Sequence, residues 1–260
     1  MCRLFGMSGG PNRVSATFWL LEAPDSLAQQ SRREPDGTGV GCFAADGAPE
    51  IFKQPLAAYA DEAFTREAKD LESRTFVAHV RYASTGEIAP QNTHPFEQCG
   101  RLFAHNGVVE DLEALEHQLG EDMRHVAGDT DSERYFALIS REIERTGDVG
   151  EGIAAATRWV AAHLPVFALS ANRHLEHASA RGSIRVRSGD LAWLPAVVVA
   201  SEPMDEDPGW RALASGELVY VDRQLRTTIA EVLSDPPAHQ LTLSDLTGKA
   251  ASSQAPVGTT

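Results

Sequence analysis

The second residue of this 260-residue chain is a cysteine that directly follows the initiator methionine. A methionine before a small residue is commonly removed, and its removal would leave Cys2 with both a thiol and a free α-amine. An α-amine has a pKa of about 7.7–8.0, so near neutral pH it can accept the thiol proton directly or through a water. Cys2 is therefore a candidate nucleophile with its own base. The apolar residues that follow it also fit a short strand in which Cys2 is an ordinary buried thiol.

Two further polar groups end apolar stretches of the chain. Arg81 lies near the end of the stretch 75–83, where its guanidinium can hold a carboxylate by two parallel hydrogen bonds or form a structural ion pair. Asn106 and Gly107 lie near the end of the stretch 101–109. A side-chain amide beside a glycine N–H can form an oxyanion hole, although Asn-Gly is also a common turn.

Asp131 and His94 are candidates for the binding of a substrate. Asp131 lies in Thr130-Asp131-Ser132-Glu133, which matches a helix capping box. At a helix start its carboxylate would complement the helix dipole. Alternatively, it would bind a substrate ammonium group, and Asp129 is a second candidate for that binding role. His94 precedes Pro95 in a loop and would order a site or serve a structural role.

The composition excludes several classes of protein. The net charge of −14, with no basic cluster, argues against nucleic acid and anionic membranes as partners. The chain has neither an apolar run long enough to span a membrane nor the layout of a signal peptide, so we expect a cytoplasmic protein. Three cysteines fit a reducing compartment. The histidines form no metal-ligand motif, and the glycines at 37–41 only superficially resemble a phosphate loop, so we expect neither a metal nor a cofactor.

Hydrophobic patterns predict sheets packed against helices within one domain at 1–246, followed by a disordered tail at 247–260. Strands are predicted at 40–44, 50–54, 75–83, 101–109, 166–170, 183–188, 196–200, 217–222 and 227–232. Helices are predicted at 60–73, 110–119, from 130 onward and at 149–164, with two short ones within 15–33.

Six motifs, taken in order, resemble those of the class II glutamine amidotransferases, which are N-terminal nucleophile glutaminases. Each motif is weak alone, but their order and the terminal place of the first make the resemblance specific. They are Cys2-Arg3-Leu4-Phe5-Gly6, Asp36-Gly37-Thr38-Gly39, Arg81-Tyr82-Ala83-Ser84-Thr85-Gly86, Asn92-Thr93-His94-Pro95-Phe96, His105-Asn106-Gly107 and Thr130-Asp131-Ser132-Glu133. The resemblance implies an α+β fold of four layers, α/β/β/α, in which two stacked antiparallel sheets lie between helical layers.

The resemblance also implies roles for the candidate residues. Cys2, once exposed, resembles the family nucleophile, and Asn106 and Gly107 resemble its oxyanion hole. Arg81, with Ser84 nearby, is similar to the residue that binds the α-carboxylate of glutamine. Asp131 resembles the partner of the α-ammonium group, and His94 matches a position that orders the site.

The chain departs from the family pattern in three respects. Tyr82 and Ser84-Thr85 follow Arg81, where many relatives carry a bulky aromatic residue and a longer polar signature. Arg33-Glu34-Pro35 precedes the Asp-Gly motif, where compact relatives often carry a histidine. The last predicted strand ends near residue 232, which leaves no room for a synthase domain. The chain is thus similar to the compact stand-alone branch, and the expected activity is hydrolysis of glutamine or a γ-glutamyl conjugate through a Cys2 thioester. The alternatives are a glutaminase subunit that delivers ammonia to a separate synthase and a catalytically silent glutamine-binding protein.

Overall fold

A seven-stranded sheet forms the centre of the protein. The computed structural model describes residues 2–83, 86–167, 174–178, 194–246, 248, 250 and 251. The strand order of the sheet is β13-β11-β12-β1-β6-β3-β4, and all of its neighbouring strands run antiparallel. Its strands are β1 (Arg3–Ser8), β3 (Gly37–Phe43), β4 (Pro49–Gln54), β6 (Thr75–Arg81), β11 (His174–Ala178), β12 (Ala196–Ala200) and β13 (Arg211–Ala212).

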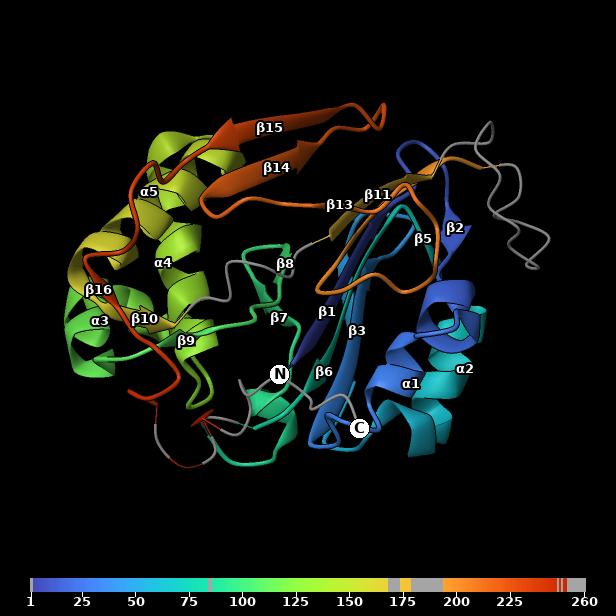
Figure 1. Cartoon of the computed structure of the whole chain (residues 1–260), viewed down its shortest axis with the longest axis horizontal. Coiled ribbons are helices and arrows are strands. Elements are labelled where there is room, and N and C mark those ends of the chain that lie inside the picture. Colours follow the sequence, from blue (N-terminus) through green and yellow to red (C-terminus); the bar gives the residue numbers. More distant parts are fainter. Residues whose placement is uncertain are drawn as a thin grey trace.

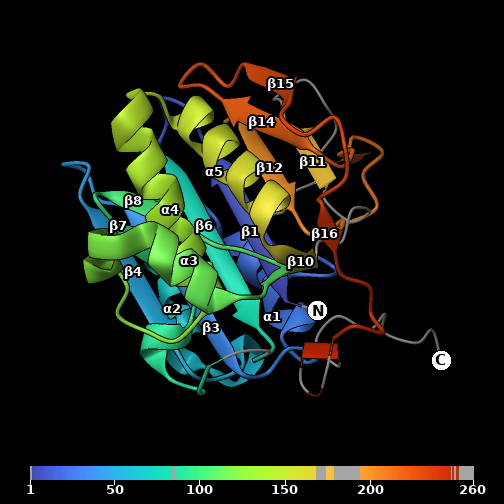
Figure 2. The ribbon, with the colours of Figure 1, turned by 90° about the vertical axis from the view of Figure 1, so that its left-hand side faces the viewer.

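The central sheet lies between two sets of covering elements (Figure 1). One face is covered by the π-helix η1 (Phe18–Glu22) and by α1 (Leu27–Gln30) and α2 (Glu62–Asp70). Short strands lie over the other face, and α3 (Leu112–Leu119), α4 (Asp131–Thr146) and α5 (Val149–His163) cover those strands (Figure 2). The predicted four-layer α+β fold is confirmed.

The second strand layer consists of short pieces. β9 (Val108–Val109), β10 (Pro165–Phe167) and β16 (His239–Gln240) form one sheet, and β7 (Phe96–Gln98) pairs with β8 (Arg101–Phe103). This layer differs from the expectation in one respect, because β10 pairs with β16 in parallel. The remaining elements are the hairpin β14 (Glu217–Val221) and β15 (Thr227–Glu231), the pair β2 (Val14–Ser15) and β5 (Glu72–Ser73), and the 3₁₀ turns η2 (Ala58–Ala60), η3 (Pro90–Asn92) and η4 (Gly120–His125).

Two hydrophobic clusters bind the helices to the strand layers. One lies between the central sheet and α1 and α2 and includes Phe5, Val40 and Phe64, none of which is exposed. The other joins α3, α4 and α5 to the second strand layer and includes Leu115 and Leu138. Burial of such side chains contributes roughly 1.5–3 kcal/mol each. The two clusters therefore hold the helical layers in place on either side of the sheets.

The glycines of β3 make room for the loop that carries His94. Successive strand residues face opposite sides of a sheet, so Gly37, Gly39 and Gly41 share one face. A Cβ on Gly39 would overlap the His94 carbonyl oxygen, and one on Gly41 would lie 2.9 Å from Pro95 Cγ. These glycines therefore allow the loop to lie flat on the strand.

The predicted strand at 101–109 is divided in the structure. Residues 101–103 form β8, whereas residues 108–109 form β9 in a different sheet. Residues 104–107 between them leave the strand conformation and carry Asn106 and Gly107. The predicted strand at 183–188 and residues 252–260 of the predicted tail lie outside the described residues.

Candidate active site

Cys2 lies immediately before β1, at the edge of a pocket where strand ends and loops meet. Its Sγ accepts a hydrogen bond from the Tyr82 backbone N–H at 3.2 Å and lies 3.4 Å from the Tyr82 carbonyl oxygen. Burial raises the pKa of the Cys2 thiol to about 11, although the backbone hydrogen bond with Tyr82 acts in the opposite direction. Near neutral pH the thiol is therefore protonated, and it needs a base to become a nucleophile.

The pocket brings together residues from five separate segments of the sequence. Its volume is about 20 Å³. It is lined by Cys2, Arg81, Tyr82, His94, His105, Gly107, Thr130, Asp131 and Ser132. Five of the predicted site residues, namely Cys2, Arg81, His94, Gly107 and Asp131, thus meet at one place. Ser84 lies outside the described residues.

Arg81 and Asp131 supply one buried cation and one buried anion to this pocket. Arg81, at the end of β6, is 3% exposed, and its Nη1 donates to the Glu87 carbonyl oxygen at 3.0 Å. Asp131 is equally buried, and its Oδ2 accepts from the Val109 N–H at 2.9 Å. Thr130, whose Oγ1 accepts from the Glu133 N–H, caps α4. The Asp131 carboxylate is therefore directed to β9 and the pocket and does not cap its own helix.

Asn106 and Gly107 line different cavities near Cys2, Gly107 the small pocket and Asn106 the larger one beside it. The Asn106 Nδ2 donates to the Cys2 carbonyl oxygen at 2.7 Å, and Asn106 itself is not among the residues that line the small pocket. Gly107 does line it. A Cβ on Gly107 would lie 2.8 Å from His105 Nε2 and 3.1 Å from the Phe167 carbonyl oxygen, so a larger residue here would require His105 to shift.

His94 packs against a second histidine that the sequence did not single out as a site residue. The rings of His94 and His79 lie 4.2 Å apart at their centroids, and both are buried. Burial lowers the pKa of His79 to about 3 and holds the pKa of His94 well below its usual range; the neighbouring Arg81 acts in the same direction on both. Both imidazoles are therefore neutral near neutral pH, and His94 can order the pocket without contributing charge.

Sequence reasoning assigned no role to His105 and Ser132, which also line the pocket. His105 Nδ1 lies 3.1 Å from Ser132 Oγ, and that hydroxyl donates to Asp131 Oδ1 at 3.4 Å. This chain of hydrogen bonds joins the 105–107 loop to the start of α4. Their position in the sequence could have indicated a role, because His105 directly precedes Asn106 and Ser132 directly follows Asp131.

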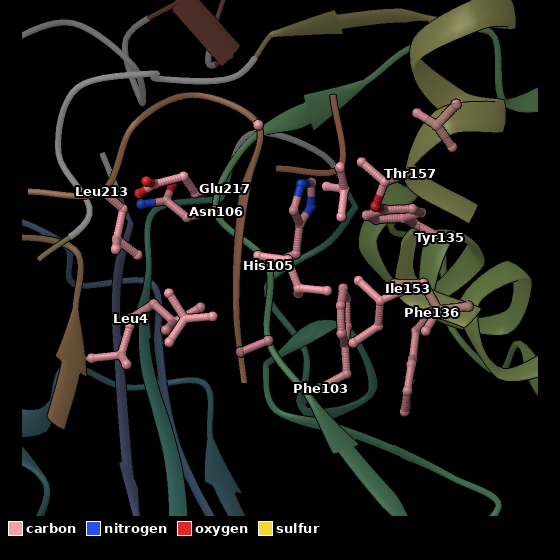
Figure 3. Close-up of a pocket in the computed structure, with 18 of the residues that line it drawn as sticks. Leu4, Phe103, His105, Asn106, Tyr135, Phe136, Ile153, Thr157, Leu213 and Glu217 are labelled. Carbon is pink, nitrogen blue, oxygen red and sulfur yellow. The ribbon is translucent and has the colours of Figure 1, made fainter. Parts of the chain in front are cut away.

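A larger cavity of about 690 Å³ lies beside the small pocket, and His105 lines both. Figure 3 shows Leu4 and Leu213 on one side of it, with Phe103, Tyr135 and Ile153 on the other. The described residues contain no group of histidines, cysteines and carboxylates that could hold a metal ion. Within the same residues, no helix has the length and hydrophobicity needed to cross a bilayer.

Comparisons with known proteins identify the family of this chain. The sequence pattern of the family described as "Glutamine amidotransferases class-II" matches residues 1–168. The chain is 31% identical over 242 residues to a γ-glutamyl-hercynylcysteine sulfoxide hydrolase of Mycobacterium tuberculosis, a match that covers 86% of this chain and 94% of that protein. It is 26% identical over 153 residues to a glutamine–fructose-6-phosphate aminotransferase of Chlamydia muridarum, where the match covers 57% of this chain and only 23% of the aminotransferase.

Solved structures share the fold at low sequence identity. A glutamine aminotransferase class-II domain protein from Silicibacter pomeroyi superposes with a TM-score of 0.56 at 20% identity, covering 88% of this chain and 98% of that one. The glutamine phosphoribosylpyrophosphate amidotransferase from Bacillus subtilis gives a TM-score of 0.59 at 18% identity, covering 90% of this chain and 50% of that one. Both confirm the layered architecture.

Proposed function

Because this chain belongs to the class II glutamine amidotransferases, we propose that it is a stand-alone hydrolase of γ-glutamyl amides with Cys2 as its nucleophile. The observation that carries the proposal is the convergence of Cys2, Arg81, Gly107 and Asp131 on one pocket. A γ-glutamyl substrate presents an α-carboxylate, an α-ammonium group and a γ-amide. The guanidinium of Arg81, the carboxylate of Asp131 and the thiol of Cys2 match these three groups.

The first chemical step is the attack of the Cys2 thiol on the γ-carbonyl carbon. Once Met1 has been removed, the α-amine of Cys2 takes the thiol proton, which overcomes the unfavourable pKa of the buried thiol. The thiolate forms a C–S bond and the carbonyl becomes a tetrahedral oxyanion. The intermediate then expels the leaving amine, which receives the proton from the Cys2 α-ammonium. A γ-glutamyl thioester remains, and a water activated by the same amine hydrolyses it to glutamate.

Gly107 and Asn106 are the proposed donors to the oxyanion. An amide NH₂ group has two hydrogens. One Asn106 hydrogen donates to the Cys2 carbonyl oxygen at 2.7 Å, and we propose that the second one donates to the oxyanion together with the Gly107 N–H. Loss of one oxyanion-hole donor typically costs about 100- to 1,000-fold in kcat.

Substrate binding has to enlarge the pocket. A volume of about 20 Å³ accommodates little more than one water, whereas a γ-glutamyl group is several times larger. The Arg81 guanidinium has five donors, so it can bind a carboxylate while it keeps its contact with the Glu87 carbonyl, or replace that contact. His94, neutral and packed on His79, supports the floor of the pocket.

The comparisons support a stand-alone enzyme over a fused one. The matched hydrolases of Mycobacterium tuberculosis and Mycolicibacterium smegmatis are covered to 94% and 96% of their length. We therefore propose glutamine or a γ-glutamyl conjugate of a small amine as the substrate, with water as the acceptor. Delivery of ammonia to a separate synthase is the second candidate, because the match to the longer aminotransferase covers only 23% of that protein.

The test is glutamate release by the purified chain that begins at Cys2, with glutamine and a panel of γ-glutamyl amides. Turnover should be lost in Cys2→Ala and retained in Cys99→Ala, which replaces an exposed cysteine. Asp131→Asn should raise KM at least about 10-fold, since the ammonium group loses its charged partner. Absence of turnover with every substrate, with activity appearing only after a synthase is added, would establish the second candidate instead.

A further inference from the structure

A network of charged side chains lies next to the nucleophile. Arg3, directly after Cys2, is 5% exposed; its Nε donates to Glu202 Oε1 at 2.6 Å and its Nη1 lies 3.6 Å from Glu34 Oε1. The Glu202 carboxylate also binds Arg33 at 2.9 Å, and Arg33 contacts Asp25 at 3.4 Å. The network runs from the half-exposed Arg33 and Asp25 inward to Arg3 and Glu34.

Glu34 is the innermost carboxylate of this network. It is 1% exposed, whereas the side chain of Glu202 is 28% exposed. The Arg3 guanidinium that contacts Glu34 also donates from Nη1 to the Cys2 carbonyl oxygen at 3.3 Å. Glu34 and the Cys2 carbonyl oxygen therefore contact the same guanidinium. A buried carboxylate in this place costs desolvation energy, which a surface ion pair would avoid.

The positive N-terminus of the chain already interacts with Glu34. Burial raises the pKa of Glu34, whereas a hydrogen bond from the chain's N-terminus and the charges of the N-terminus, Arg3 and Arg33 act in the opposite direction. Glu34 also acts on the Cys2 thiol, so it lies close to Cys2 as well. Removal of Met1 would make the α-ammonium of Cys2 the N-terminal charge near Glu34.

We propose that Glu34 is a positioning residue that binds the α-amino group of Cys2 and directs it toward the thiol. The inference rests on the proposed function, since it concerns the amine that acts there as the base. A carboxylate beside an amine favours the ammonium form. Glu34 would thus hold the amine in one orientation and also set the lowest pH at which the amine can accept the thiol proton.

Other charged groups face Cys2 from the elements packed around it. Arg3 and Arg33 favour the neutral amine and partly offset Glu34, and Arg81 on β6 acts in the same sense across the pocket. Asp131 on α4 also faces the pocket, where His94 and His105 lie beside it. None of these groups is altered in the variants described below, so their effects cancel in each comparison.

The test measures the rate at which iodoacetamide alkylates Cys2 as a function of pH, followed by mass spectrometry of the Cys2 peptide. This readout needs no turnover, so it stays informative even if no γ-glutamyl substrate is found. Chains that begin at Cys2 are compared with chains that retain Met1. In the processed chain, Glu34→Gln should shift the midpoint of the profile by about one pH unit to lower pH. The maximal rate should fall about 10- to 100-fold, because the amine is no longer oriented.

The control variants separate this role from a structural one. Glu34→Asp retracts the carboxylate by one methylene and should shift the midpoint in the same direction by a smaller amount. It also tests the proposal if Glu34→Gln does not fold. Glu202→Gln removes the more exposed anion of the network and should leave the midpoint nearly unchanged. The proposal is overturned if both Glu34 variants keep the wild-type midpoint, or if the shift is equally large in chains that retain Met1, since Glu34 would then act on the thiol alone.

Discussion

His79 on β6 links the stability of the fold to pH. The side chain has no exposed surface, and its ring packs against the tilted ring of His94. Burial, reinforced by the nearby Arg81 guanidinium, lowers its pKa from 6.5 to about 3. The native state therefore keeps His79 neutral while the unfolded chain gains a proton below about pH 6.5. By linkage, the free energy of unfolding falls as the pH drops below that value, and the loss is complete only below about pH 3.

The expected magnitude follows from these two pKa values. Between pH 7 and pH 5 His79 of the unfolded chain goes from about one quarter protonated to almost fully protonated, which lowers the free energy of unfolding by about 2 kcal/mol. Urea denaturation at the two pH values measures this loss. Other groups titrate in the same range, and the lowered pKa of His94 acts in the same direction. The comparison is therefore with His79→Phe, which keeps a ring but cannot bind a proton.

Wild-type protein should lose about 2 kcal/mol more stability than His79→Phe between pH 7 and pH 5. The Phe variant must first be shown to unfold cooperatively at pH 7. Equal losses in the two proteins would refute the reasoning, because they would mean that His79 is protonated to the same extent in the native and unfolded states.

Two glycine substitutions test the packing that positions the site. Gly39→Ala places a Cβ against the His94 carbonyl oxygen, so we expect a loss of about 1–3 kcal/mol or more in urea denaturation together with slower alkylation of Cys2. Gly6→Ala is the matched control, since its Cβ would meet only the Val199 carbonyl oxygen at 3.8 Å. Gly152→Ala brings a Cβ within 2.6 Å of the α4 backbone, and this overlap should outweigh the gain of about 1 kcal/mol in helix propensity and lower the Tm. A higher Tm would show that α4 and α5 can separate easily.

Much of the fold could be predicted because local patterns and tertiary structure agree. The strands predicted at 40–44 and 50–54 pair as β3 and β4, and Thr130 caps the start of α4 as the capping pattern indicates. The division of the predicted strand at 101–109 could not be predicted, because β-branched and aromatic residues favour a strand without specifying its sheet. The parallel pairing of β10 with β16 depends on contacts across about 70 residues of sequence, which no local pattern encodes.

The candidate site could likewise be predicted only where its residues carry a local sequence pattern. The residue types and order of Cys2, Arg81, Gly107 and Asp131 in the sequence predict a common site, and all four line the small pocket. The contribution of Glu34 was not predictable, because a single glutamate before a Pro-Asp-Gly turn carries no periodic signal. Its burial depends on Arg3 and Glu202, which come from distant parts of the chain.

The sequence also does not indicate that the glycines of β3 support the site. The alternation of Gly37 and Gly39 along the strand is explained only by the loop that packs on them, which belongs to a later part of the chain. The sequence therefore predicts which residues carry chemistry better than it predicts which residues support them. Supporting residues act through contacts between segments far apart in the chain.

The central claim is that Cys2 is a reactive nucleophile in a pocket that binds γ-glutamyl groups. Measurement of the intact mass of the protein tests this claim most directly. The protein is measured before and after incubation with 6-diazo-5-oxonorleucine, a glutamine analogue that alkylates the nucleophile of glutaminases. We predict loss of Met1, followed by a single covalent adduct that maps to Cys2 and is prevented by Cys2→Ala. A retained Met1, or a processed chain that gains no adduct, would contradict the account and favour a catalytically silent or partner-dependent protein.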